Sequence, residues 1–224
     1  MNKIKFIITR FREKEEQFAW VKLLDDFVIF NKGNEEELSP ELQKYTINSK
    51  NVGKDGEVIL SYIINNYDNL EETIIFTQAN IKPHYFYNDE TFVSLIADIG
   101  ESGFSEKFMS QYKTSEELTG FYMVSKKSLN HSTFNIEEWP IGEKLGNYHL
   151  SYNLETWWKK TTGEKYIQNK RIFWGCIFGI KKELILRRSK SFYETLRKPF
   201  LDHSNPVETH FIERAWPNIF KIDS

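Results

Sequence analysis

The chain has 224 residues and a mass of 26.7 kDa, of which 40% are hydrophobic and 16% aromatic. This apolar content is enough to build a core and excludes an intrinsically disordered chain. The 30 Lys and Arg residues are balanced by 32 Asp and Glu residues, for a net charge of −2, which argues against a nucleic-acid-binding protein. The single cysteine, Cys176, allows neither an internal disulfide nor a cysteine-based zinc site.

The N-terminal apolar run ends at Arg10, too early for a signal peptide, and no stretch reaches the roughly 18 apolar residues of a transmembrane helix. We therefore expect a cytoplasmic protein without a membrane-spanning segment. No linker, repeat or low-complexity tract interrupts the chain, which predicts a single domain over residues 1–224.

The first 80 residues alternate between apolar runs typical of buried strands and amphipathic runs typical of helices. In chain order, the pattern predicts strand Lys3–Arg10, helix Glu13–Leu24, strand Asp26–Phe30, loop or single helical turn Glu35–Lys50, helix Gly53–Asn66 and strand Thr73–Phe76. Such an alternation predicts an α/β fold whose central sheet is mostly parallel, with neighbouring strands joined by right-handed crossovers.

The rest of the chain is less regular until its last 70 residues. The weaker predictions are a helix at Thr91–Ile99 and a strand at Gly120–Ser125. The stronger ones are helix Leu154–Lys160, apolar strand Arg171–Ile180, helices Lys181–Arg188 and Ser191–Phe200, and a last helix, Val207–Trp216, closed by Pro217.

Polar residues follow each of the first three strands, at Thr9–Glu13, Asn31–Gly33 and Thr77–Asn80. Parallel sheets bind ligands outside the carboxyl ends of their strands, so these segments are candidates for a binding site. The alternative is that loops are polar simply because they are solvated.

Several kinds of active site are excluded by the absence of their motifs. The chain has no phosphate-binding P-loop, no dinucleotide-binding glycine fingerprint and no G-x-S-x-G nucleophile elbow. Its five histidines are scattered, without the i, i+4 pair typical of a helical zinc site.

Two carboxylates on the predicted last helix, Glu208 and Glu213, are candidates for a general base that accepts a proton from an attacking hydroxyl. Five residues of helix set them about 140° apart, so at most one of them faces a given site. Each also has a structural alternative. Glu208 stabilises the helix dipole from the first turn, and Glu213 forms an ion pair with Arg214.

Four segments of the chain together resemble a family of uncharacterised, glycosyltransferase-like proteins of fungi, bacteria and large viruses. They are the opening Ile7–Glu13 and Trp20, then Phe27–Gly33, then Asn51–Glu57 with Asn66–Leu70 and Phe76–Gln78, and finally Gly175–Tyr193 with Phe211–Phe220. The resemblance implies the single-domain, GT-A-like fold of nucleotide-diphospho-sugar transferases. It also implies transfer of a sugar from a nucleotide-sugar donor to a hydroxyl of a carbohydrate or glycoconjugate acceptor, as in polysaccharide biosynthesis.

The start of the last helix is similar to the branching N-acetylglucosaminyltransferases, in which a Ser-Pro-Asp-Glu stretch supplies the base. Asn205-Pro206-Val207-Glu208 occupies that place here. The similarity implies that Glu208 is the base, with Glu213 as the alternative. It also implies a reaction that inverts the configuration at the anomeric carbon of the sugar.

Metal-dependent members of this transferase class end a strand with Asp-x-Asp, whereas Thr73–Phe76 continues into Thr77-Gln78-Ala79-Asn80 without a carboxylate. We therefore expect no metal ion and no other cofactor. Cationic side chains must then stabilise the diphosphate. The expected donor-binding residues are Thr9, Arg10, Arg12, Lys32, Gln78 and Arg214.

Trp139, Trp157 and Trp158 are candidates for acceptor binding because aromatic faces stack on sugars. The alternative is that these side chains belong to the core. A second hypothesis for the whole chain is a non-catalytic carbohydrate- or nucleotide-binding module on the same fold. The two hypotheses differ in whether nucleoside diphosphate is released when an acceptor is present.

Overall fold

The computed structural model describes residues 4–34, 37–80, 154–167 and 176–222. The helix predicted at Thr91–Ile99, the strand predicted at Gly120–Ser125, residues 171–175 and Trp139 lie outside the described residues. No helix in the described part is long and apolar enough to cross a membrane.

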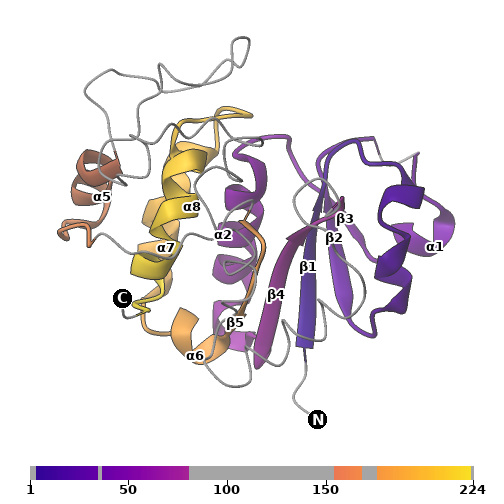
Figure 1. Ribbon diagram of the computed structural model, residues 1–224, viewed down its shortest axis with the longest axis horizontal. Helices are drawn as coiled ribbons and strands as arrows, with labels where there is room; N and C mark the ends of the chain where they lie inside the picture. The colour runs from indigo at the N-terminus through magenta and orange to yellow at the C-terminus, as the bar shows by residue number, and fades with distance from the viewer. Residues whose placement is uncertain (1–3, 35–36, 81–153, 168–175, 223–224) are drawn as a thin grey trace, which may run out of the picture.

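Five strands of the described residues form one sheet in the order β3-β2-β1-β4-β5 (Figure 1). Their bounds are β1 Ile4–Arg10, β2 Phe27–Asn31, β3 Thr46–Asn48, β4 Thr73–Gln78 and β5 Phe178–Lys181. The first four strands are parallel, and β5 pairs antiparallel with β4. The predicted α/β class and the parallel neighbours of the first strand are therefore confirmed.

The helices and helical turns lie between and after these strands. They are η1 Glu15–Gln17, η2 Ala19–Leu23, α1 Pro40–Gln43, α2 Lys54–Asn66, η4 Tyr67–Asn69, α5 Leu154–Thr162, α6 Lys182–Ile185, α7 Lys190–Arg197, η8 Lys198–Phe200 and α8 Glu208–Ile219. In Figure 1, α2, α7 and α8 stand on one side of the sheet, with α5 beyond them, and α1 lies on the other side.

Alternating side chains of the strands divide the core between the two faces of the sheet. Ile7, Phe76 and Phe178 pack in the larger cluster with the buried faces of α2, α5, α7 and α8. Ile8 and Ile75 face the smaller cluster, which η2 and α1 complete.

Two predicted elements are shorter than expected: of the strand predicted over Arg171–Ile180, the described part begins only at Phe178, after Cys176 with its positive φ of 55°, and the helix predicted over Lys181–Arg188 is the single turn α6. Three further predictions differ from the structure. The helix expected over Glu13–Leu24 is instead η1 and η2, interrupted at Phe18, whose φ of −137° is not helical. Phe18 and Val21 are both fully buried, and their spacing of three residues is that of a 3₁₀ turn.

The second difference is β3, in a segment predicted to be a loop or a single helical turn. This short edge strand is largely exposed, so it lacks the apolar alternation that indicates a strand. The third difference is that α8 continues past Pro217 to Ile219. Because Pro217 lies in the last turn, its missing N–H removes only one hydrogen bond of the helix.

Candidate functional site

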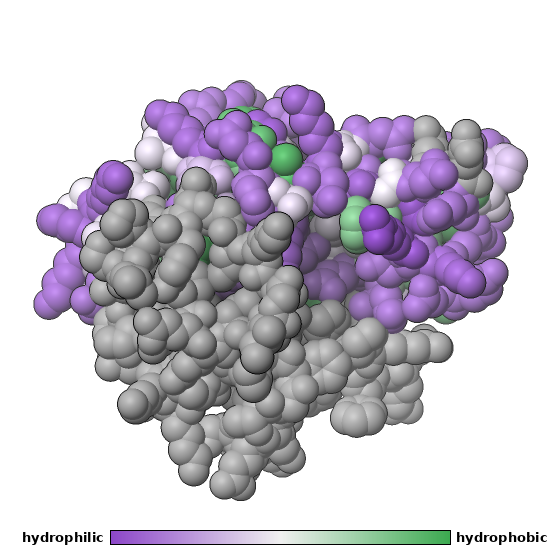
Figure 2. All heavy atoms as spheres, turned by 90° about the horizontal axis from the view of Figure 1, so that it is seen from above, coloured by the Kyte–Doolittle hydropathy of each residue, from purple (hydrophilic) through white to green (hydrophobic). Residues whose placement is uncertain are grey.

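A polar cleft of about 440 Å³ opens at the carboxyl ends of β1 and β4. From β1 the chain proceeds to β2 and β3 on one side and then crosses to β4 on the other, so these two ends flank the switch point of the topology. Thr9, Phe11, Glu13, Lys32, Asn51, Lys54, Asp55, Gln78, Ser204 and Asn205 line the cleft. Figure 2 looks toward this edge of the sheet, where most of the visible described surface is hydrophilic.

Asp55 joins the strand ends within the cleft. It lies in the first turn of α2, and its Oδ2 accepts a hydrogen bond of 3.1 Å from Nε2 of Gln78, the last residue of β4. Thr9 of β1 also hydrogen-bonds to the Asp55 side chain. Two of the predicted donor-binding residues, Thr9 and Gln78, are thus brought together, by a carboxylate that sequence analysis did not single out.

The environment of Asp55 raises the pKa of its carboxyl. Burial is the largest cause, and the nearby charge of Glu13 acts in the same direction. The charges of Lys32 and Lys54 and the hydrogen bond with Thr9 oppose it. Asp55 therefore holds a proton more tightly than an exposed aspartate does, while it remains a hydrogen-bond acceptor at the wall of a cleft.

The backbone before Asp55 is left-handed at two successive residues, Gly53 with φ 60° and Lys54 with φ 46°. The Gly53 N–H donates to the His203 carbonyl oxygen at 2.8 Å, which fixes the segment before α8 against the start of α2. A Cβ at Gly53 would lie 2.6 Å from Cβ of Glu57 and 2.8 Å from the Phe200 carbonyl oxygen. Only glycine fits this turn, and the turn is what brings Ser204 and Asn205 to the cleft.

Lys32 lines the cleft, but its ammonium is buried and bound to the protein. Its Nζ donates to the carbonyl oxygens of Val52 and, at 2.5 Å, Lys54, and it lies 3.6 Å from Oε2 of Glu57. Burial lowers the pKa of this ammonium, and the charges of Glu57 and Asp55 oppose the shift. These contacts therefore fit a structural role of Lys32 and not the expected role in binding a diphosphate.

Arg10 is fully buried and is not among the residues that line the cleft. Its guanidinium donates to the backbone oxygens of Glu13 and Asn34 at 2.9 Å each, to Oδ1 of Asn31 at 2.7 Å and to Oε2 of Glu37 at 2.6 Å. These bonds join the loops that follow β1 and β2, so Arg10 holds these loops together from beneath the surface of the cleft. The expected direct contact between Arg10 and a donor is not what this geometry offers.

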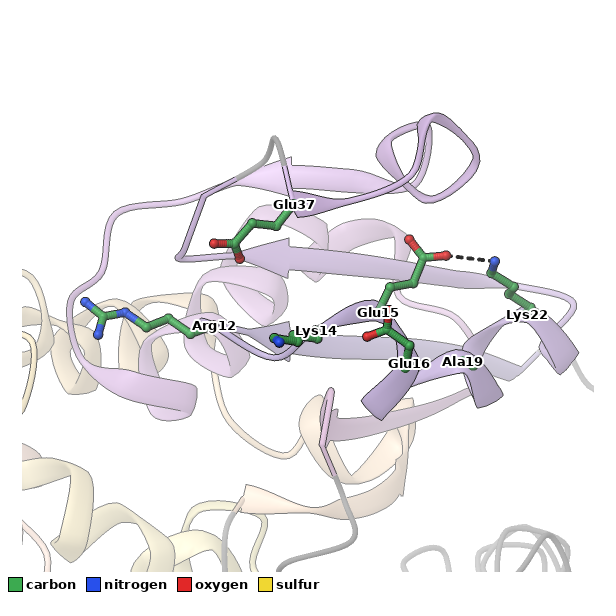
Figure 3. A pocket seen from close by; sticks show the side chains of 7 residues that line it. All are labelled: Arg12, Lys14, Glu15, Glu16, Ala19, Lys22 and Glu37. Atoms are coloured by element: carbon green, nitrogen blue, oxygen red, sulfur yellow. Dashed lines mark ion pairs between the residues drawn. The ribbon is translucent and has the colours of Figure 1, made fainter.

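Arg12 lies in a separate groove of about 610 Å³, beside the cleft (Figure 3). Side chains of the loop after β1 alternate, with Phe11 and Glu13 lining the cleft and Arg12 and Lys14 lining the groove. In Figure 3 the Arg12 side chain extends away from the ion pair of Lys22 with Glu15, which spans 2.8 Å. The Arg12 guanidinium lies 4.7 Å from the centre of the Phe11 ring, a cation–π contact at the border between the two hollows.

Of the predicted residues of α8, Glu208 and Arg214 are buried and Glu213 is partly exposed. Glu208 begins the helix but is only 2% exposed, and neither Glu208 nor Glu213 lines the cleft. Arg214 is also buried, with Nη1 donating to the His210 carbonyl oxygen at 2.6 Å and lying 3.9 Å from Oε2 of Glu213. The cleft approaches this helix through Ser204 and Asn205, which precede it.

Trp157 and Trp158 of α5 are 0% and 1% exposed and belong to the larger core cluster. The ring of Trp157 packs 5.8 Å from Phe211 of α8, and that of Trp158 packs 6.3 Å from Phe192 of α7. Protein atoms therefore occupy the ring faces that stacking on a sugar would need. Both residues therefore belong to the core, which was the alternative to acceptor binding.

The described residues contain no group of three or more His, Cys, Asp or Glu side chains arranged to hold a metal ion. The cleft residues that sequence analysis missed come mainly from the start of α2 and the segment before α8: Asn51, Lys54, Asp55, Ser204 and Asn205. One signal could have pointed to Asp55, because the first turn of a helix that follows a parallel strand lies at the edge of the sheet where ligands bind.

A family model described as "Protein of unknown function (DUF3431)" matches residues 7–224, and the chain belongs to this family. No curated protein and no solved structure matches the chain.

Proposed function

We propose that the protein transfers a sugar from a nucleotide-sugar donor to a hydroxyl of a carbohydrate or glycoconjugate acceptor, and that the donor binds in the cleft. The observation that carries the proposal is the position of this polar cleft at the switch point between β1 and β4, where open parallel sheets bind nucleotides and related ligands. The resemblance of the N- and C-terminal segments to glycosyltransferase-like proteins supports the same activity. A volume of about 440 Å³ is within the range of ligand-binding pockets, about 300–1,000 Å³.

The charges around the cleft favour one orientation of the donor. Asp55 and Glu13 contribute two carboxylates, and the ammonium of Lys32 is already bound to backbone oxygens and Glu57. Such a wall suits the uncharged nucleoside end of a donor, whose N–H and O–H groups donate to carboxylates, better than the diphosphate. The transferred sugar then lies toward Ser204 and Asn205, near the start of α8.

Glu208 remains the proposed base because it follows Asn205 closely and begins α8 on the side of the proposed sugar position. Its burial requires that neighbouring atoms move before an acceptor hydroxyl reaches it. A base of this kind contributes about 10²–10⁴ in rate and little to donor binding.

The second candidate function is a binding module that retains the cleft without catalysis. The burial of Glu208 and the absence of both Glu208 and Glu213 from the cleft lining favour this alternative. The two functions share donor binding and differ only in turnover.

A screen of nucleotide sugars tests both functions. Calorimetry measures binding, and release of nucleoside diphosphate in the presence of mixed saccharide acceptors measures turnover. The transferase proposal expects both signals for at least one donor, with turnover lost in Glu208→Gln while donor binding remains. Binding without acceptor-dependent release would establish the binding module instead. If no donor binds, the transferase and a nucleotide-binding module are both refuted, and only a carbohydrate-binding module remains.

Asp55→Asn tests the site itself. Loss of a charged acceptor is expected to weaken donor binding about tenfold or more, because a hydrogen bond to a charged group contributes about 1.5–3 kcal/mol. The control is Asp25→Asn, since Asp25 is exposed and lies outside the cleft lining. Equal affinities in the two variants would show that the donor does not bind in this cleft.

Turnover is also expected to persist in EDTA, because β4 ends at Gln78 without a carboxylate.

A further inference from the structure

The ammonium of Lys32 spans a backbone turn at the wall of the cleft. Lys32 follows β2, and its Nζ donates to the carbonyl oxygens of Val52 and Lys54, which lie on either side of Gly53. Gly53 and Lys54 are the two successive left-handed residues before Asp55. Left-handed backbone is unfavourable for a lysine, so this turn needs contacts that hold it in place.

Lys32 is itself held by a buried network that reaches α7. Its Nζ lies 3.6 Å from Oε2 of Glu57, and Oε1 of Glu57 accepts hydrogen bonds from Ser61 at 2.6 Å and from Nη2 of Arg197 at 2.7 Å. Glu57 is therefore bound by two cations and a hydroxyl, which compensates the cost of burying its charge. The contacts run from the cleft wall through β2 and α2 to α7.

The N–H donors of the Lys32 ammonium are therefore taken up by contacts within the protein. We propose that Lys32 is a positioning residue, which holds the turn at Val52–Lys54 and so sets Lys54 and Asp55 in the cleft, and that it does not contact the ligand. Lys32 holds this turn in the ligand-free protein, so its positioning role is independent of glycosyl transfer.

The test compares Lys32→Met with Arg197→Met, each of which removes one of the two cations that bind Glu57. Both substitutions are expected to lower the melting temperature, because each removes a cation that compensates the buried charge of Glu57. In each variant the other cation and Ser61 still contact Glu57. Only Lys32→Met removes the bridge across the turn and the positive charge beside Asp55. Lys54 and Glu13, which also act on Asp55, are retained in both variants.

Two measurements on the ligand-free protein distinguish the variants. In Lys32→Met, the pKa of the Asp55 carboxyl, followed by NMR titration, is expected to rise, because the charge of Lys32 opposes the effect of burial. Amide hydrogen exchange at Gly53 and Glu57, whose N–H groups donate to the carbonyl oxygens of His203 and Gly53, is expected to accelerate about tenfold or more relative to the later turns of α2. Arg197→Met is expected to change neither quantity.

A Lys32→Met protein with an unchanged Asp55 pKa and unchanged exchange at Gly53 and Glu57 would overturn the proposal. So would a loss of ligand affinity without either change, since that result describes direct contact with the ligand. If Lys32→Met does not fold, Lys32→Gln serves in its place, because its side-chain amide keeps N–H donors while the charge is lost. Its Asp55 pKa is expected to rise in the same way.

Discussion

At the scale of single residues, the inner face of α8 is notable for ionisable groups in a buried setting. His210 is 4% exposed, and burial together with the charges of Lys54 and Arg214 holds its pKa well below the usual 6.5. Burial also lowers the pKa of the Arg214 guanidinium, and the nearby charge of Glu213 opposes that shift. His210 is therefore neutral in the folded protein over a pH range in which an unfolded chain takes up a proton.

This difference predicts that His210 makes stability depend on pH. Its contribution is fully present above the unfolded pKa of about 6.5 and is lost as the pH falls from there toward the lower folded pKa, by up to about 1.4 kcal/mol per pH unit. Between pH 7.5 and 5, the free energy of unfolding of His210→Gln, measured in urea, is expected to fall less than that of the unmodified protein. His203→Gln, outside α8, is the control. A fall as steep in His210→Gln as in the unmodified protein would contradict the prediction.

At the scale of elements, the start of α2 decides the shape of the cleft. Its first turn supplies Lys54 and Asp55, and the left-handed turn at Gly53 packs against Phe200 and accepts no side chain. The hydrogen bond from Gly53 to His203 then fixes the segment that leads into α8. Gly53 thus sets the position of two walls of the cleft, the first turn of α2 and the segment before α8.

Gly53→Ala is expected to destabilise the protein by about 2 kcal/mol or more, because an alanine adds a steric overlap to the cost of a positive φ. Gly163→Ala is a matched control. Gly163 has φ 75°, but a Cβ there meets nothing within 4 Å, so only the conformational cost of about 1 kcal/mol remains. Urea unfolding of both variants measures the difference. Equal losses of stability would show that the overlap at Gly53 is relieved by movement of Phe200.

At the scale of the whole described structure, the sheet separates a large core from a small one. β1 lies at the centre and pairs along its length with both β2 and β4, whereas β3 is a three-residue edge strand paired on one side. Among the described residues, those of α2, α5, α7 and α8 cover one face, and those of η2, α1 and nearby loops cover the other.

This arrangement predicts a gradient of local stability across the sheet. Native-state hydrogen exchange is expected to be slowest for amides of β1 and β4, which open only with the whole domain, and fastest for β3, which can separate from β2 alone. β2 is expected to lie between them. Exchange in β3 as slow as in β1 would mean that the edge strand opens together with the centre.

The sequence predicted the centre of the fold more fully than its margins. The strands beginning near Lys3, Asp26 and Thr73 are apolar runs, and the structure confirms that the first is parallel to the other two and lies between them. β3 was missed because a short, exposed edge strand is stabilised by backbone pairing rather than by buried side chains. The helix expected after β1 became two 3₁₀ turns because Phe18 and Val21 both enter the small core.

The sequence by itself determined that polar groups gather at the carboxyl ends of parallel strands, because apolar strand runs and their direction follow from local pattern. Only the tertiary structure decided which of those groups face the cleft. Arg10 and Lys32 have the charge expected of donor ligands, but nearby backbone oxygens and carboxylates take up their donors. Asp55 reaches the cleft because the turn at Gly53 directs the start of α2 toward Thr9 and Gln78. Most hydrogen-bond partners of Arg10 and Lys32 lie 20 or more positions away in the sequence, so no local pattern contains them.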